Sequence, residues 1–189
     1  MQVEPRTFYE AEETADAVRD KLESAKEAGE SVDYLTLVPD GEPTLDMNLG
    51  RLIELLKPLK HKIAVITNAS LIWRADVREE LMKADWVSLK VDSVREETWR
   101  RINRPHRALR LTSILNGMLE FAKACRGELT TETMLVTGVN DSNGHAEEIA
   151  GFLARLEPTR AYVSILYEHG PGNHGPRDRP GPRRGPQMH

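Results

Sequence analysis

The feature that most constrains the fold of this chain is a regular alternation of helical and strand-like periodicity. Short apolar or β-branched runs occupy residues 34–38, 62–67, 86–91, 129–136 and 161–166. Apolar residues at helical spacing precede the first run and separate the others, over residues 11–25, 49–56, 77–81, 114–125 and 149–156. Five strands alternating with helices predict an α/β fold with a parallel sheet.

The length of the chain limits how that sheet can close. A closed eight-stranded barrel typically takes about 250 residues, whereas this chain has 189. An open sheet or a partial barrel is therefore expected. The pattern begins with a helix, where a βα unit would supply a strand first, so we expect one strand to be missing. A further helix is predicted from Ser93, because Ser93 and Glu96 have capping-box spacing.

Composition divides the chain into two parts. Residues 1–169 have the mixed composition of a folded domain, and residues 170–189 hold five Gly, five Pro and four Arg. Such a tail cannot bury enough apolar surface to offset its ordering entropy, so we predict that it is disordered. With a net charge of −4, no membrane-spanning run and no signal-peptide pattern, the chain is expected to be cytoplasmic and not a nucleic-acid-binding protein as a whole.

The single cysteine restricts metal chemistry. Cys125 can form neither an intramolecular disulfide nor a cysteine-based metal site by itself. It follows Ile114, Met118 and Phe121 along one helical stripe. We therefore interpret Cys125 as a small hydrophobic packing residue rather than as a reactive thiol.

Polar residues follow the predicted strands at the points where ligands bind in parallel α/β folds. They are Asp40–Thr44 after the first strand, Thr67–Ser70 after the second, and Gly138–Asp141 after the fourth. In the third strand, Ser88, Lys90 and Asp92 share one face. This face indicates either a polar functional interior or the solvated side of an edge strand. Taken singly, the Gly-Glu-Pro turn and Asn68 are also explained as ordinary turn residues.

The combination of these motifs in this order is more specific. Gly-Glu-Pro, Thr-Asn, Ser-x-Lys-x-Asp and Gly-Val-Asn-Asp, with residues 99–105 (WRRINRP), resemble the radical S-adenosylmethionine (SAM) superfamily. The branch that they resemble contains the tRNA wyosine-synthesis enzyme and uncharacterised prokaryotic Fe–S oxidoreductases. The resemblance spans residues 8–165. It implies a partial (β/α)6 barrel, present here as an incomplete barrel with five parallel strands.

The resemblance also implies which residues bind SAM. In the family, the Gly-Glu-Pro backbone holds the amino group of the SAM methionine, a role that would fall to Gly41, Glu42 and Pro43. Polar residues at the ends of the next two family strands contact the methionine and ribose. The matching residues here are Thr67, Asn68, Ser88, Lys90 and Asp92. Asn140 matches the turn near the ribose and adenine.

One family motif has no counterpart in this chain. Relatives carry Cys-x3-Cys-x2-Cys after their first strand, and its thiolates hold a [4Fe-4S] cluster. Cys125 matches none of these cysteines, so the chain is not expected to bind the cluster or to be active by itself. Three hypotheses follow: a radical SAM domain in a truncated chain, a cluster-free SAM-binding or inactive remnant, or an unrelated α/β binding protein. A frame change near Leu166 would explain the tail.

A basic stretch suggests a substrate class. Its members are Arg100, Arg101, Arg104, His106, Arg107 and Arg110. Cations in this arrangement would contact phosphates of an RNA substrate, as the wyosine resemblance implies. The alternative is a solvated helix end and loop without a binding role.

Overall fold

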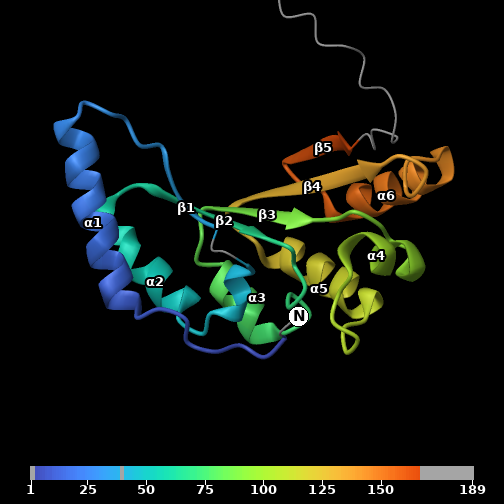
Figure 1. Ribbon diagram of the computed structural model, residues 1–189, viewed down its shortest axis with the longest axis horizontal. Helices are drawn as coiled ribbons and strands as arrows, with labels where there is room; N and C mark the ends of the chain where they lie inside the picture. Colours follow the sequence, from blue (N-terminus) through green and yellow to red (C-terminus); the bar gives the residue numbers. More distant parts are fainter. Residues whose placement is uncertain (1–2, 39–40, 167–189) are drawn as a thin grey trace, which may run out of the picture.

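The computed structural model describes residues 3–38 and 41–166, and these residues form one parallel sheet with helices between its strands (Figure 1). The strands are β1 (Tyr34–Leu37), β2 (Lys62–Thr67), β3 (Trp86–Lys90), β4 (Glu128–Val136) and β5 (Arg160–Leu166). Their order in the sheet is β1-β2-β3-β4-β5, and every neighbouring pair is parallel. The prediction of an α/β fold with five parallel strands is confirmed.

Six α-helices and two short 3-10 turns lie before and between the strands within the described residues. The α-helices are α1 (Ala11–Glu27), α2 (Leu49–Leu56), α3 (Ala75–Leu81), α4 (Glu96–Asn103), α5 (Leu111–Ala124) and α6 (Asn143–Leu156), and the 3-10 turns are η1 (Pro43–Leu45) and η2 (Lys57–Leu59). None of these helices is long and apolar enough to cross a membrane. The tail predicted to be disordered, residues 170–189, lies outside the described residues.

The strand order determines where the helices lie. Because each strand pairs with the next one in sequence, right-handed crossovers place all connecting helices on the same face of the sheet. In Figure 1 the helices accordingly gather on one side of the curved sheet. The opposite face is the inner face of a partial barrel. Cross-strand register gives this inner face Ser88 beside Thr130 and Lys90 beside Glu132.

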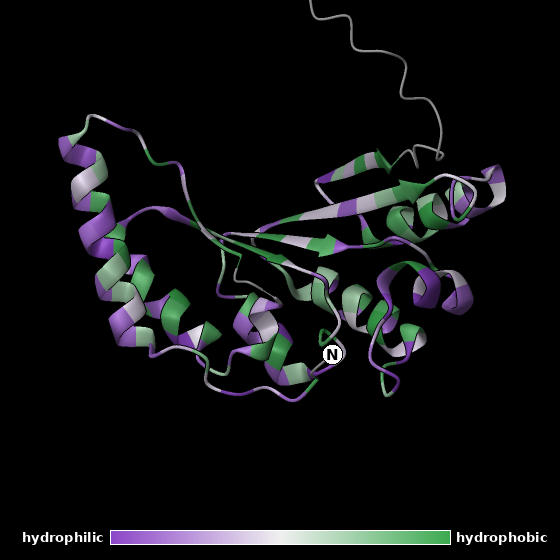
Figure 2. Cartoon of the chain, viewed as in Figure 1, coloured by the Kyte–Doolittle hydropathy of each residue, from purple (hydrophilic) through white to green (hydrophobic). Residues whose placement is uncertain are grey.

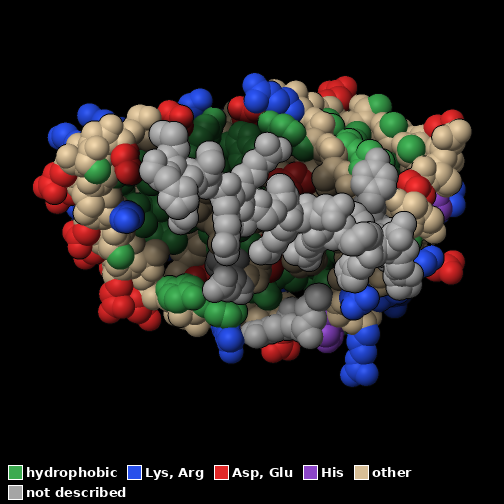
Figure 3. All heavy atoms as spheres, turned by 45° about the horizontal axis from the view of Figure 1, so that its top comes forward, with side chains coloured by type: hydrophobic (Ala, Val, Ile, Leu, Met, Phe, Trp, Pro, Cys, Tyr) green, Lys and Arg blue, Asp and Glu red, His purple; other side chains and the backbone are tan. Residues whose placement is uncertain are grey.

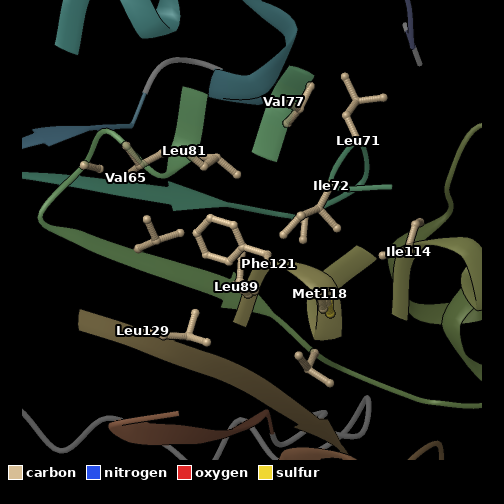
Figure 4. Close-up of a cluster of buried hydrophobic side chains, with 14 of the residues drawn as sticks. Val65, Leu71, Ile72, Val77, Leu81, Leu89, Ile114, Met118, Phe121 and Leu129 are labelled. Carbon is tan, nitrogen blue, oxygen red and sulfur yellow. The ribbon is translucent and has the colours of Figure 1, made fainter. Parts of the chain in front are cut away.

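The hydrophobic core fills the layer between the sheet and the helices. Phe121 of α5 is fully buried, and Figure 4 shows its ring against the sheet, close to Val65, Leu89 and Leu129. Ile53 and Leu56 of α2 are also fully buried. Figure 2 shows the same division, with hydrophobic residues recurring in the central strands and in the helices that pack on them, whereas α1 is more hydrophilic.

Three local predictions are corrected by the structure. The capping box is wrong, because α4 begins at Glu96 with Arg95 as its N-cap, and the Ser93 hydroxyl instead accepts a hydrogen bond from the Arg95 backbone at 3.0 Å. The edge-strand interpretation of β3 is wrong, because β3 is the central strand. Cys125 is not within a helix but caps the end of α5, half-buried against the core.

Two glycines allow a matched test of helix packing. A Cβ at Gly117 of α5 would lie 2.6 Å from the Ile72 carbonyl oxygen and 2.7 Å from the Trp73 Cα, whereas a Cβ at Gly151 of α6 would meet no atom within 4 Å. We predict that Gly117→Ala destabilises the fold by about 1–3 kcal/mol through overpacking. Gly151→Ala should stabilise it by about 0.5–1 kcal/mol through helix propensity. Urea denaturation measures both, and equal effects would contradict the close packing of α5.

Candidate functional site

The loops that follow the strands meet at the carboxyl edge of the sheet. Parallel pairing of β1 with β2 and of β2 with β3 brings the loop at 41–45 next to Thr67–Ser70, and Thr67 next to the end of β3. Pairing of β3 with β4 brings Lys90 beside Glu132. The predicted site residues therefore belong to one edge of one sheet, as ligand sites in such folds do.

The Glu42 carboxylate fastens the first of these loops to the second. Its Oε1 accepts hydrogen bonds from the Thr44 backbone N–H at 3.1 Å, from the Thr44 hydroxyl at 2.7 Å and from the Thr67 hydroxyl. Its Oε2 accepts one from the Asn68 backbone N–H at 2.7 Å. Glu42 is 8% exposed. The side chain thus positions the Gly-Glu-Pro turn, whereas the motif resemblance had implied a role only for its backbone.

The residues on either side of Glu42 differ in how accessible they are to a ligand. Gly41 is exposed and has φ +145°, a backbone conformation that favours glycine, and the space where a Cβ would project is open. Pro43 is buried and begins η1. A cavity of about 360 Å³ adjoins the turn, lined by these three residues together with Phe8, Tyr9 and Val38. Backbone groups of the turn are consequently accessible from this side.

Asn68 is both a turn residue and a candidate ligand contact. Its Oδ1 accepts a hydrogen bond from the Ser70 backbone N–H at 2.9 Å, and Ala69 between them has φ +59°. The side chain is exposed. Its amide NH₂ donates to no group among the described residues. The turn therefore holds the side chain by its acceptor and leaves its donor available.

Both carboxylate oxygens of Asp92 accept hydrogen bonds. Oδ1 accepts from the Met134 backbone N–H at 2.8 Å and lies 3.3 Å from the Lys90 ammonium. Oδ2 accepts from the Asn103 side-chain amide at 2.6 Å. The Asp92 side chain is 0% exposed, whereas that of Lys90 is 32% exposed. Asp92 thus holds Lys90 and α4 against β4, and Asn103 is a site residue that the motifs did not single out.

Asn140 joins the ends of β3 and β4 through side-chain hydrogen bonds. Its amide NH₂ donates to the Asp92 carbonyl at 2.7 Å and to the Met134 carbonyl at 2.9 Å. Its Oδ1 accepts from the Val136 backbone N–H at 2.6 Å. The residue is 0% exposed. Each polar atom of the side chain is therefore used within the protein, and Asn140 can influence a ligand by positioning the two strand ends.

Ser88 lies further inside the partial barrel. It is 1% exposed, and its hydroxyl donates to the Glu132 carboxylate at 3.1 Å. Because β3 is central, the polar side chains of Ser88 and Lys90 line the inner face rather than bulk solvent. Glu132 was not anticipated from the sequence. The alternation of β4 placed it on the Ser88 face, but pairing across the sheet was needed to bring the two together.

A second cavity, of about 180 Å³, lies beneath α4 and α5 at the same edge. Its polar lining includes Asn68, Lys90 and Asp92. The predicted residues thus form two neighbouring groups that share Asn68 at their boundary. Gly41, Glu42 and Pro43 lie on one side, with Thr67 held by Glu42, and Lys90 and Asp92 lie on the other. Ser88 and Asn140 line neither cavity.

The side chains of the described residues do not provide the ligands that an iron–sulfur cluster needs. Among the described residues, no three His, Cys, Asp or Glu side chains are grouped so that they could hold a metal ion. Cys125, the single cysteine of the sequence, lies where α5 ends, and burial raises the pKa of its thiol. A raised pKa disfavours the thiolate that ligates iron.

The half-barrel fold, with polar loops gathered at its carboxyl edge, defines a class of ligand-binding α/β proteins, and comparison with known sequences gives the family. Residues 3–153 match the model of the radical SAM superfamily. The chain therefore belongs to the radical SAM superfamily.

Curated proteins similar to this chain include several UPF0026 proteins. A UPF0026 protein of Methanocaldococcus jannaschii is 45% identical over 162 residues, which are 86% of this chain and 50% of that protein. A UPF0026 protein of Synechocystis is 44% identical over 124 residues, which are 65% of this chain and 46% of that protein. The chain spans about half the length of the curated relatives that it matches.

Solved structures support the fold. TYW1 with a bound lysine-pyruvate adduct superimposes with a TM-score of 0.68 at 19% identity, over 89% of this chain and 58% of that one. Archaeal TYW1 gives a TM-score of 0.59 at 20% identity, over 83% of this chain and 57% of that one. The partial barrel with five parallel strands that the motifs predicted is confirmed at the level of the fold.

The carboxylate of Glu42 can be tested directly. Glu42→Gln would place an amide NH₂ where one carboxylate oxygen now accepts hydrogen bonds. We predict a loss of about 2–4 kcal/mol of unfolding free energy, because hydrogen bonds to a charged acceptor contribute about 1.5–3 kcal/mol each. Glu79→Gln, at an exposed position of α3, is the control and should leave stability unchanged. Urea denaturation measures the free energy of unfolding of both variants. Equal stability of the two would show that Glu42 does not fasten the loops.

The absence of a cluster-binding set gives a second test. After anaerobic reconstitution with iron and sulfide, the purified chain should hold far less than one [4Fe-4S] cluster per molecule, because one cysteine cannot replace three thiolate ligands. Cys125→Ser is the matched control and should show the same iron content as the wild type. A stoichiometric cluster that disappears in Cys125→Ser would contradict this prediction.

Proposed function

We propose that this chain forms the SAM-binding part of a radical SAM enzyme. The observation that carries the proposal is the Glu42 carboxylate, which joins the Gly-Glu-Pro turn to the Thr67–Asn68 backbone. This tie leaves the Gly41 backbone and the Asn68 amide exposed at one edge of the sheet. The match of residues 3–153 to the superfamily supports the same assignment.

The proposed roles follow from the accessibility of each group. Backbone carbonyls of the Gly-Glu-Pro turn would accept hydrogen bonds from the methionine ammonium of SAM. The Asn68 NH₂ and the Lys90 ammonium would donate to the methionine carboxylate or ribose. Ser88 would contribute through its hydrogen bond to Glu132 on the inner face.

Four other predicted residues are buried and act by holding the accessible groups in place. Glu42 and Thr67 hold the turn together, and Asp92 and Asn140 hold the ends of β3 and β4. A preorganised backbone lowers the conformational cost of binding. In this proposal the four buried residues are therefore positioning residues for SAM.

Radical chemistry requires a group that these residues do not hold. In the family, a [4Fe-4S] cluster supplies the electron that cleaves SAM to a 5′-deoxyadenosyl radical. We assign that activity to a complete enzyme that includes a cluster-binding segment, acting on RNA in the cytoplasm. The RNA assignment rests on the motif resemblance to the wyosine-synthesis branch. A cluster-free SAM-binding or inactive module is the second candidate, favoured by Cys125 being the single cysteine.

Asn68→Asp tests SAM binding without disturbing the turn. Aspartate keeps the acceptor for the Ser70 N–H but replaces the free NH₂ donor with a negative charge that would repel the methionine carboxylate. We predict that the Kd for SAM, measured by calorimetry, rises at least threefold, in line with about 0.5–1.5 kcal/mol per hydrogen bond. Asn116→Asp, on the exposed side of α5, carries the same charge change and should bind SAM like the wild type.

Two results would count against the proposal. Absence of measurable SAM binding by the wild type would leave the inactive module as the better interpretation. Equal weakening by Asn68→Asp and Asn116→Asp would reduce the effect to net charge and remove Asn68 from the site. Melting temperatures of all three proteins should agree, because neither substitution removes a contact within the protein.

A further inference from the structure

One carboxylate on the inner face of the sheet has no cationic partner. Glu132 of β4 is partly buried, and its Oε1 accepts a hydrogen bond from the Ser88 hydroxyl of β3 at 3.1 Å. In the part of the chain that the structure describes, Glu132 belongs to none of the ion pairs. The Ser88 hydroxyl is neutral, so the negative charge of Glu132 is left without a countercharge.

The cation that lies beside Glu132 in the sheet register does not neutralise it. Lys90 is the partner of Glu132 across β3 and β4, but its ammonium pairs with the Asp92 carboxylate at 3.3 Å. A carboxylate that loses part of its hydration is costly unless an opposite charge compensates for the loss. Departures from such local rules are expected at functional sites. The uncompensated charge of Glu132 therefore marks it as a candidate ligand contact.

The second acidic side chain of the inner face differs from Glu132 in this respect. Glu128 lies on the same face of β4, and Arg160 lies on that face of β5. The pKa of Arg160 is raised by its hydrogen bond to Tyr162 and also by the charge of Glu128, so the two charges are close enough to interact. Among the acidic side chains of the described inner face, Glu132 is thus the one without a cation to balance it.

The surroundings of Glu132 suit an organic cation. Tyr162 is its partner on β5 and is 47% exposed, so an aromatic ring is accessible next to the carboxylate. The face of such a ring also attracts cations. Figure 3 turns the side where β4 and β5 lie in Figure 1 toward the viewer. Among the atoms drawn in colour, acidic side chains are visible near the middle of that face, and most basic ones lie at its rim.

The hydrogen bond from Ser88 distinguishes between two kinds of cation. A guanidinium typically binds a carboxylate with two parallel N–H donors, one to each oxygen. It would compete with Ser88 for Oε1 of Glu132. An ammonium is a compact point charge that can bind a single oxygen. The Oε2 atom accepts no hydrogen bond from the described residues, so the carboxylate offers one free oxygen, which favours an ammonium.

We propose that Glu132 binds a protonated primary amine of the substrate on which the SAM-dependent enzyme acts. Ser88 would orient the carboxylate, and the ring of Tyr162 would lie beside the amine. Because Lys90 is both the neighbour of Glu132 and a proposed contact of SAM, the amine would be held next to SAM. The position of SAM rests on the proposed function, whereas the unpaired carboxylate and the neighbouring ring are independent of it.

Binding of n-butylammonium tests the amine site in this chain. The nitrogen-15-labelled protein is titrated with butylamine hydrochloride at neutral pH and low salt, and the backbone amide signals of Glu132 and Tyr162 are followed. Glu132→Gln removes the charge but keeps an acceptor for Ser88, so the Kd should rise about tenfold, as the loss of a charge-assisted hydrogen bond implies. Glu128→Gln makes the same charge change on the same face of β4 and should bind like the wild type.

Two further probes test the chemistry of the ligand. n-Butanol has the same alkyl chain without the charge and should leave both amide signals of the wild type unshifted. n-Butylguanidinium should bind the wild type severalfold more weakly than n-butylammonium, and Ser88→Ala should reduce that difference, because it frees Oε1 of Glu132. Equal shifts with n-butanol would overturn the charge assignment, and equal or tighter binding of n-butylguanidinium by the wild type would overturn the assignment to an ammonium.

The remaining outcomes separate this inference from the proposed function. Absence of n-butylammonium binding, or an equal effect of Glu132→Gln and Glu128→Gln, would overturn the inference even if SAM binds. A weaker affinity of Glu132→Gln for SAM would show that the carboxylate contacts SAM itself and would also overturn it. Amine binding with the expected pattern in a protein that does not bind SAM would support the amine site and contradict the proposed SAM site.

Thermal stability gives a readout that a structural role would move. Glu132→Gln should melt no lower than the wild type, because the carboxylate has no ion pair to lose and glutamine keeps the acceptor for Ser88. A clearly lower melting temperature would identify Glu132 as a residue that stabilises the sheet and would overturn its assignment to ligand binding.

Discussion

The structure depends on one constraint, the pairing of each parallel strand with its successor in sequence. Right-handed crossovers then place every connecting helix on one face, and the sheet curves into part of a barrel whose inner face carries no helix among the described residues. All strand ends with functional loops lie at the same edge. Polar side chains of β3 and β4 can therefore face one another across the inner surface, as Ser88 and Glu132 do.

Two buried carboxylates hold that edge in shape. Glu42 accepts four hydrogen bonds that join the loop after β1 to the end of β2, and Asp92 joins α4 to β4. A buried charge is costly unless its hydrogen bonds are satisfied, so each carboxylate strongly favours one arrangement of its neighbours. The accessible groups proposed to contact SAM, at Gly41, Asn68 and Lys90, are positioned by this buried network.

The site also shows that the residues of one family motif have different structural roles. Gly-Glu-Pro joins a glycine that leaves open space, a glutamate that is buried and a proline that begins a 3-10 turn. Similarly, Asn68 is held by the Ser70 backbone N–H through its acceptor, which leaves its donor exposed at the edge of the sheet. Satisfying one end of an amide can thus define the hydrogen-bonding character that a pocket presents to a ligand.

Local sequence patterns predicted the helices and strands, because hydrophobic periodicity and β-branched runs involve residues that are close in sequence. Residues 62–67 were expected as a strand and are β2. The motif residues at Glu42, Asn68 and Lys90 were likewise expected at one edge, since parallel strands end together. Local pattern failed at Ser93, where capping-box spacing occurs outside the helix, because α4 begins only at Glu96 and the Glu96 carboxylate instead accepts from the Leu111 N–H at 3.0 Å.

The sequence by itself determined the α/β class, the five strands and the family, because these depend on periodicity and on motif order along the chain. Only the tertiary structure decided which site residues are buried positioning groups and which are exposed, since that depends on partners such as Met134 for Asp92, 42 residues away. It also decided that Arg100 pairs with Glu96, while Arg101 has no acidic partner among the described residues. Burial and charge pairing are properties of contacts between distant segments, and no local spacing encodes them.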